Sequence, residues 1–121
     1  MKLMSMREIK FRAWDKKRKT MWEVDCLNWY DEHMWVNESP MSGDKLPIGS
    51  TPIMQFTGLT DRHGVEIYEG DIILVIDAVS MEQSAHEVKW AGIGWNRQIL
   101  FTQVEVIGNI YETPELLEAN Q

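Results

Sequence analysis

The side chains best suited to bind a ligand are cations that alternate with aromatic rings near the start of the chain. Lysine and arginine neutralise phosphate groups and aromatic rings stack on bases, so this combination is typical of surfaces that bind single-stranded nucleic acid. Such contacts would be carried by Arg12, Lys16, Lys17, Arg18, Lys19, Trp14 and Trp22. The alternative is a solvated hairpin turn, because four consecutive cations are unfavourable to bury.

Charge is divided very unevenly along the chain. The 121 residues carry a net charge of −7, yet residues 1–19 hold eight Lys or Arg and two acids, whereas residues 20–121 hold four and seventeen. The acidic remainder repels phosphate and weighs against nucleic acid. A basic arm and an acidic body are complementary between copies of one chain, so we expect a homo-oligomer. Six Trp and eight Met suit the apolar part of such an interface.

The pattern gives little support for a metal or catalytic centre. Metal sites need clustered His, Cys or carboxylate ligands, but the three histidines and the single cysteine lie far apart, at His33, His63, His86 and Cys26. Nucleophilic catalysis needs a Ser or Cys beside a base, and no G-x-S-x-G sequence is present. We therefore expect no metal and no cofactor, identify no small-molecule substrate, and name no catalytic residue.

Four carboxylates gather around the centre of the chain, at Asp61, Glu66, Glu69 and Asp71. A pair of them could perform acid–base chemistry. Two of the four, the aspartates, flank glycine turns, where Asp accepts backbone hydrogen bonds, so a structural role is the better interpretation. Three glycines spaced by six residues are also interpreted as turn residues, because no phosphate-binding glycine motif is present; they are Gly58, Gly64 and Gly70.

The first part of the chain is expected to form two hairpins. Ile9, Phe11 and Ala13 alternate with Lys10, Arg12 and Trp14, which predicts a half-buried strand. This strand is expected to form a hairpin over 7–24 with a polar turn. A second hairpin is expected over 25–36. Pro, Gly and Ser then predict a loop or linker over 37–53. The chain is treated as one domain, 1–121; if it divides, the parts are 6–36 and 54–121 on either side of this linker.

The second part is expected to be mainly strands. Strands are predicted at 54–57, 65–68, 72–76, 85–90, 95–101 and 104–111. The run 72–76 has no polar face and is interpreted as buried on both sides. Thr113 and Pro114 predict the start of a short C-terminal helix, with Leu116 and Leu117 packing back on the sheet. The fold class is therefore mainly β, a small barrel or sandwich.

Three blocks together resemble the YopX family of phage and prophage proteins. They are Arg7–Asp15; Gln55–Leu59 with Asp61, Gly64 and Ile67–Ile72; and Val106–Glu112 with Pro114–Leu117. Their order and spacing cover essentially the whole chain. Family members usually begin just before the first block, so residues 1–5 look like an upstream start, and segment 77–100 departs from the family's common pattern.

The resemblance implies a small β-rich fold with an SH3-like barrel in the C-terminal half, and an origin in a phage or prophage. It carries no reaction, cofactor or catalytic residue onto these positions. A lone cysteine and the lack of an apolar stretch of roughly 18 residues indicate a cytoplasmic protein without a membrane span. We expect a non-enzymatic, homo-oligomeric interaction protein. The first alternative is a nucleic-acid-binding module that uses the basic hairpin, and the second is an enzyme of unknown reaction.

Overall fold

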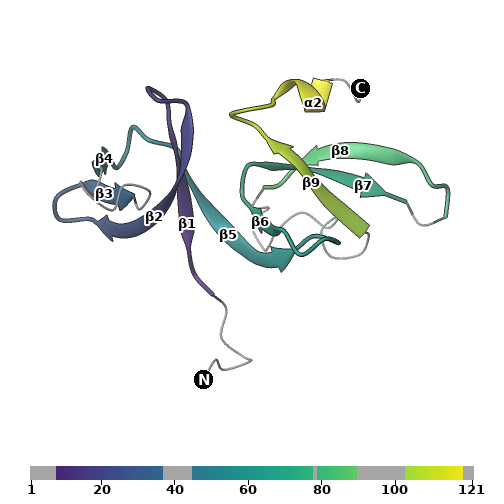
Figure 1. Cartoon of the computed structure of the whole chain (residues 1–121), viewed down its shortest axis with the longest axis horizontal. Coiled ribbons are helices and arrows are strands. Elements are labelled where there is room, and N and C mark those ends of the chain that lie inside the picture. Colours follow the sequence, from purple (N-terminus) through teal and green to yellow (C-terminus); the bar gives the residue numbers. More distant parts are fainter. Residues whose placement is uncertain (1–7, 37–44, 78, 90–102, 119–121) are drawn as a thin grey trace. The chain divides into compact units, whose positions relative to one another are not determined.

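The chain divides into two compact units, which we call the N-terminal unit (Ile9–Gln55) and the C-terminal unit (mainly Phe56–Gln121). The computed structural model describes residues 8–36, 45–77, 79–89 and 103–118 (Figure 1). These residues form nine strands and one short helix, so the mainly β fold is confirmed. No helix in the described ranges is long and apolar enough to cross a bilayer.

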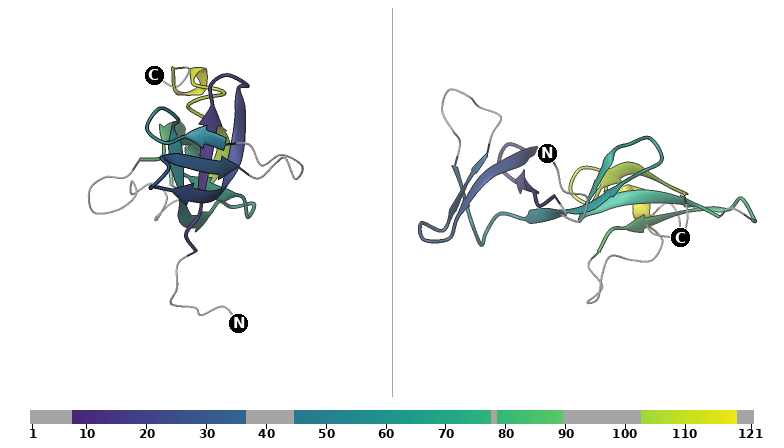
Figure 2. Two further views of the ribbon diagram at one scale, coloured as in Figure 1. Left: turned by 90° about the vertical axis from the view of Figure 1, so that its left-hand side faces the viewer. Right: turned by 90° about the horizontal axis from the view of Figure 1, so that it is seen from below.

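The N-terminal unit is an antiparallel arrangement of strands in the order β4-β3-β2-β1-β5. Its strands are β1 (Phe11–Asp15), β2 (Thr20–Asn28), β3 (His33–Val36), β4 (Lys45–Pro47) and the first part of β5 (Ile53–Thr60). Both expected hairpins are present, as Figure 2 shows from two further sides. The prediction of a loop over 37–53 is wrong in part, because β4 lies within this segment and pairs with β3. Residues 37–44 lie outside the described ranges.

The core of the N-terminal unit follows from the alternation of its strands. Ala13, Met34 and Val36 are buried, and partly buried apolar side chains pack around them. These partly buried side chains are Trp22, Val24, Leu27, Leu46, Ile48 and Ile53. The alternating pattern fails at Ile9, which lies before β1 and is 71% exposed. The two hairpins therefore share one small core that depends on β3 and β4 as well as on β1.

The C-terminal unit contains the rest of β5 paired with β6 (Glu66–Tyr68), and a three-stranded antiparallel sheet in the order β8-β7-β9. The remaining elements are β7 (Asp71–Ile76), β8 (Gln83–Glu87), β9 (Gln103–Asn109) and α2 (Glu115–Glu118). As predicted, β7 is the buried central strand, and α2 packs against β8. In the part of the chain that is described, neither sheet closes into a barrel. The predicted strand at 95–101 lies outside that part.

The three glycines spaced by six residues have two different roles. Gly64 and Gly70 have φ of 84° and 86° and lie in the turns that flank β6, as predicted. Gly58 was expected in a turn but lies within β5, where the pairing with β6 shifts register between Phe56 and Thr60. Its φ of 87° is a left-handed conformation that glycine adopts without strain. Gly58 therefore lies at an irregularity within strand β5 rather than in a turn.

Candidate anion-binding site

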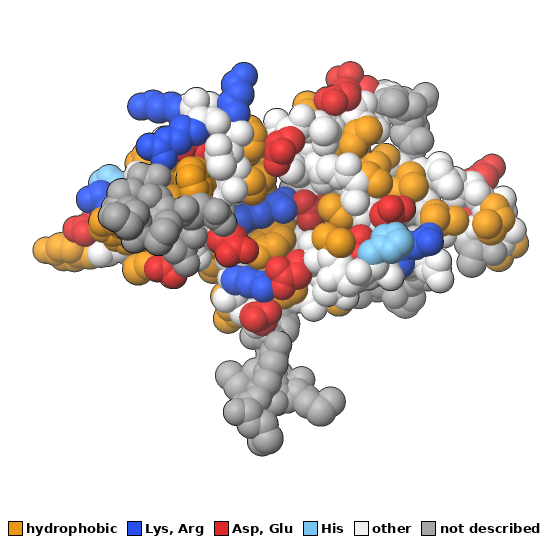
Figure 3. Space-filling model, viewed as in Figure 1, with side chains coloured by type: hydrophobic (Ala, Val, Ile, Leu, Met, Phe, Trp, Pro, Cys, Tyr) orange, Lys and Arg blue, Asp and Glu red, His pale blue; other side chains and the backbone are white. Residues whose placement is uncertain are grey.

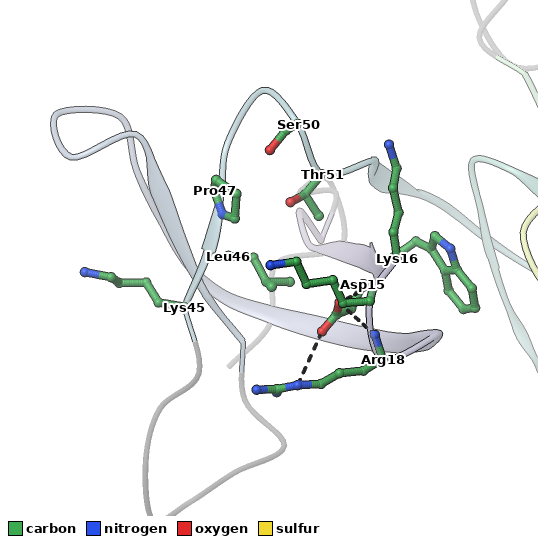
Figure 4. A pocket seen from close by; sticks show the side chains of 10 residues that line it. Asp15, Lys16, Arg18, Lys45, Leu46, Pro47, Ser50 and Thr51 are labelled. Atoms are coloured by element: carbon green, nitrogen blue, oxygen red, sulfur yellow. Dashed lines mark hydrogen bonds and ion pairs between the residues drawn. The ribbon is translucent and has the colours of Figure 1, made fainter.

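The β1–β2 turn is organised by the buried carboxylate of Asp15. Its Oδ1 accepts hydrogen bonds from the backbone N–H groups of Lys17 (3.0 Å) and Arg18 (3.2 Å). Its Oδ2 accepts one from the indole Nε1–H of Trp22 (3.3 Å) and lies 3.8 Å from Nε of Arg18. Lys19, with φ of 51°, completes the turn. Because these hydrogen bonds fix the backbone of the turn, its exposed cationic side chains extend into solvent from defined positions (Figure 4).

A hollow of about 350 Å³ lies beside this turn, and we call it the basic hollow. Its walls come from the first hairpin and from the segment that begins with β4. The lining residues are Trp14, Asp15, Lys16, Lys17 and Arg18, and on the other side Lys45, Leu46, Pro47, Ser50 and Thr51. Residues that are far apart in the sequence therefore form a single depression in the N-terminal unit.

Backbone bonds hold the second wall in place. The backbone N–H of Trp14 donates to the carbonyl of Pro52 (3.0 Å), and that of Ile48 donates to the carbonyl of Glu32 (2.9 Å). Ile48 also forms a bridge with Thr51, and Gly49 between them has φ of 101°. The short loop that carries the Ser50 and Thr51 hydroxyls is thus anchored to both hairpins.

The basic hollow has a strong excess of positive charge. Its lining holds four cations against one carboxylate, and that carboxylate already accepts three hydrogen bonds. Within the described residues no carboxylate pairs with the Lys16 or Lys17 ammonium group. The Lys45 ammonium lies 5.3 Å from the centre of the Trp35 ring, and Figure 4 shows it pointing away from Asp15. Cations beside two hydroxyl donors favour binding of an oxyanion.

The structure brings together some of the expected contact residues and separates others. Lys16, Lys17, Arg18 and Trp14 all line the basic hollow, and Lys19 is exposed on the same turn without lining it. Arg12 is half-buried in β1, where it faces Glu23 of β2 across the strand pair.

The expectation that Trp22 offers a stacking face is not supported. Its ring packs against the core of the N-terminal unit, and its indole N–H donates to Asp15. Sequence reasoning missed the second wall of the hollow, Lys45, Ser50 and Thr51. No local pattern marks these three residues, since the pairing of β4 with β3 places Lys45, and backbone bonds to Trp14 and Glu32 anchor the loop of Ser50 and Thr51.

The two central aspartates, Asp61 and Asp71, support backbone structure, as the turn pattern predicts. Asp61 Oδ1 accepts hydrogen bonds from the N–H groups of His63 (2.8 Å) and Val65 (2.9 Å), and Oδ2 accepts one from Val106 of β9 (3.0 Å). Burial raises the pKa of Asp61, but these bonds and the nearby His63 outweigh it and hold the pKa below its ordinary value of 3.8. Asp71 accepts a bond from the N–H of Tyr68 (2.8 Å).

One pair of residues has the composition of a catalytic dyad. On β8 the Ser84 Oγ lies 2.8 Å from His86 Nε2. Residues two apart on one strand share a face, so such a contact arises from strand geometry alone. Neither residue lines the basic hollow. Over the described ranges there is also no group of three side chains that could hold a metal ion.

Comparison with known proteins supports the resemblance seen in the sequence. Residues 10–118 match the family described as YopX protein. The chain is also similar to the crystal structure of protein EF1440 from Enterococcus faecalis, with 33% sequence identity and a TM-score of 0.63, over 93% of this chain and 99% of that chain. No protein of curated function matches the chain.

Proposed function

This chain belongs to the YopX family, and from that premise we propose that it is a non-enzymatic interaction protein that assembles with copies of itself. The resemblance stated above implies a phage or prophage origin, and we place the protein in the cytoplasm of the bacterial host. The resemblance carries no reaction, and the carboxylates of Asp61 and Asp71 accept hydrogen bonds from backbone N–H groups.

The observation that carries the proposal is the separation of charge between the two units. Residues 9–55 hold seven Lys or Arg and seven acids, with four of the cations consecutive in the β1–β2 turn, whereas residues 56–121 hold three Lys or Arg and eleven acids. Exposed acids of the C-terminal unit surround its helix, at Glu112, Glu115 and Glu118. Figure 3 shows the cations over the β1–β2 turn and acids at α2. The turn of one copy is complementary to α2 of another.

Such a contact joins two different surfaces of the same chain. Repeated between copies, it builds a ring if the rotation closes and a filament if it does not. Trp29 and Tyr30, at the β2–β3 turn, are 69% and 96% exposed and supply apolar area of the kind enriched at interfaces. Because the charges are solvent-exposed, the assembly is expected to weaken as salt rises.

The test is the mass in solution by multi-angle light scattering at about 50 mM and about 500 mM salt, where screening differs several-fold. We expect a multimer at low salt that loses mass at high salt. Glu115→Gln with Glu118→Gln should lower the mass at low salt. The matched control, Asp77→Asn with Glu82→Gln, removes the same charge from the exposed β7–β8 turn and should leave the mass unchanged.

Charge reversal makes the test specific for the two surfaces. Lys16→Glu with Lys17→Glu, and Glu115→Lys with Glu118→Lys, should each be monomeric alone and should form a complex when mixed. A wild-type chain that is monomeric at both salt concentrations, or reversed variants that do not associate on mixing, would overturn the proposal.

A further inference from the structure

We propose that the basic hollow is a binding site for a phosphate ester, with the phosphate held between the β1–β2 turn and the loop that carries Ser50 and Thr51. The inference goes beyond self-assembly, since it assigns the hollow a ligand that is not a copy of the chain. Free nucleotides carry the phosphate as a monoester and single-stranded nucleic acid carries it as a diester, and both forms present anionic phosphate oxygens to the same cations.

The polar part of the hollow fits a tetrahedral phosphate better than a single carboxylate. Lys16 and Lys17 reach it from one wall as point charges with several N–H donors, and Ser50 and Thr51 bring hydroxyl donors from the other. The non-bridging oxygens of a phosphate project in tetrahedral directions rather than in one plane, so a phosphate can accept hydrogen bonds from both walls at once. The hollow therefore supplies donors on opposite sides of the position that the phosphorus atom would take.

Asp15 does not oppose an anion in this hollow. Its two oxygens are taken by the N–H groups of Lys17 and Arg18 and by the indole N–H of Trp22, and Arg18 Nε lies beside it. The negative charge is therefore neutralised inside the turn, while Lys16 and Lys17 extend outward from it. The carboxylate stabilises the turn, and the positive charges of the two lysines remain available to attract the ligand.

The remaining lining favours an ester over inorganic phosphate. Trp14 on one wall and Leu46 and Pro47 on the other give the hollow apolar surface next to the cations. A volume of about 350 Å³ is larger than one phosphate needs and lies at the lower end of small-molecule pockets. A sugar or base attached to the phosphate can contact this surface, as aromatic and apolar side chains do in nucleotide-binding grooves.

The experiment measures ligand binding on the Glu115→Gln, Glu118→Gln variant, whose substitutions lie outside the hollow. Isothermal titration calorimetry at about 50 mM salt compares inorganic phosphate, a nucleoside, its 5′-monophosphate and an oligothymidylate. Fluorine NMR of 5-fluorotryptophan protein, with Trp14 assigned by Trp14→Phe, reports whether the ligand reaches the apolar surface. Calorimetry gives an affinity whether or not this variant assembles, so failure of the self-assembly proposal and failure of the phosphate site are told apart.

We expect the monophosphate to bind saturably and to shift the Trp14 signal, and the nucleoside to do neither. Lys16→Gln with Lys17→Gln should weaken binding at least tenfold, because both side chains are exposed and their loss leaves the fold intact. Lys89→Gln, an exposed lysine of the C-terminal unit, is the control and should bind as before. Oligothymidylate binding that is tighter than the monophosphate and falls steeply with salt would identify nucleic acid as the source. Equal affinities would identify the free nucleotide.

Three results would overturn the inference. The first is no saturable binding of any phosphate compound, and the second is equal weakening by the lysine pair and the control. The third is that inorganic phosphate and the monophosphate bind with equal affinity and neither shifts the Trp14 signal. The site would then bind phosphate without recognising the group esterified to it.

Discussion

Replacing Asp61 by asparagine should strongly destabilise the C-terminal unit. The carboxylate holds its own turn through His63 and Val65, and it holds β9 through Val106, which lies 45 residues further along the chain. An asparagine oxygen can keep the two local bonds. Its NH₂ group then faces the N–H of Val106, so a donor meets a donor.

The size of the effect follows from these three bonds. A hydrogen bond to a charged acceptor contributes about 1.5–3 kcal/mol, and a backbone N–H left without an acceptor costs about 1–3 kcal/mol. The lost bond to Val106 and the weaker local bonds together predict a loss of about 3 kcal/mol in the free energy of unfolding. For a domain of this size that corresponds to a fall in Tm on the order of 15 °C.

The measurement is urea and thermal unfolding of wild type and Asp61→Asn, with amide hydrogen exchange at Val106 as a local readout. Asp77→Asn is the matched control, because Asp77 caps an exposed turn through the N–H groups of Val79 and Ser80. It has no long-range bond among the hydrogen bonds of the described residues, and its substitution should have a much smaller effect. Equal losses in the two variants, or unchanged exchange at Val106, would refute the reasoning.

Three further predictions concern the same unit. Folding lowers the pKa of Asp61 from 3.8, so the ionised carboxylate stabilises the fold fully above about pH 4–5, and this contribution is lost as pH falls through the lower folded pKa. The free energy of unfolding, measured across acid pH, should therefore depend less on pH in Asp61→Asn than in wild type. Gly108→Ala places a Cβ against Thr113 and should cost about 2–3 kcal/mol in urea unfolding, whereas Gly64→Ala, with open space but φ of 84°, should cost about 1–2 kcal/mol. Asn109→Ala removes the acceptor of two backbone N–H groups and should lower stability by about 1–2 kcal/mol by the same assay.

Features set by neighbouring residues could be predicted from the sequence. The Asp61 turn with its left-handed Gly64, both early hairpins and the helix after Pro114 each depend on residues within a few positions of one another. The buried strand β7 was also predictable, because a run without a polar face needs cover on both sides.

Features set by tertiary pairing could not be predicted. Strand β4 has only 3 residues, one of them a proline, and is too short to show an alternating pattern. Only its pairing with β3 identifies it as a strand. Gly58 resembles a turn glycine in its local sequence, and only the pairing of β5 with β6 places it at an irregularity within a strand. Half of the basic hollow was predictable, since the lysines of the turn are consecutive. Its other half depends on Lys45, Ser50 and Thr51, whose position is fixed by backbone bonds to distant residues.

Strand β5 takes part in both units, and this has a consequence for synthesis on the ribosome. Its first part pairs with β1, which is already made when β5 emerges, so the N-terminal unit can complete its pairing as soon as Gln55 is free. Its second part pairs with β6, but the turn between them is tied by Asp61 to Val106, which lies 45 residues later. At roughly 5–20 residues per second, those residues take about 2–9 s to appear. During that interval the N-terminal unit of the nascent chain is folded, while the C-terminal part of β5 belongs to a unit that is still incomplete. The unpaired edge of this strand can then pair with strands of other chains, which is a route to aggregation.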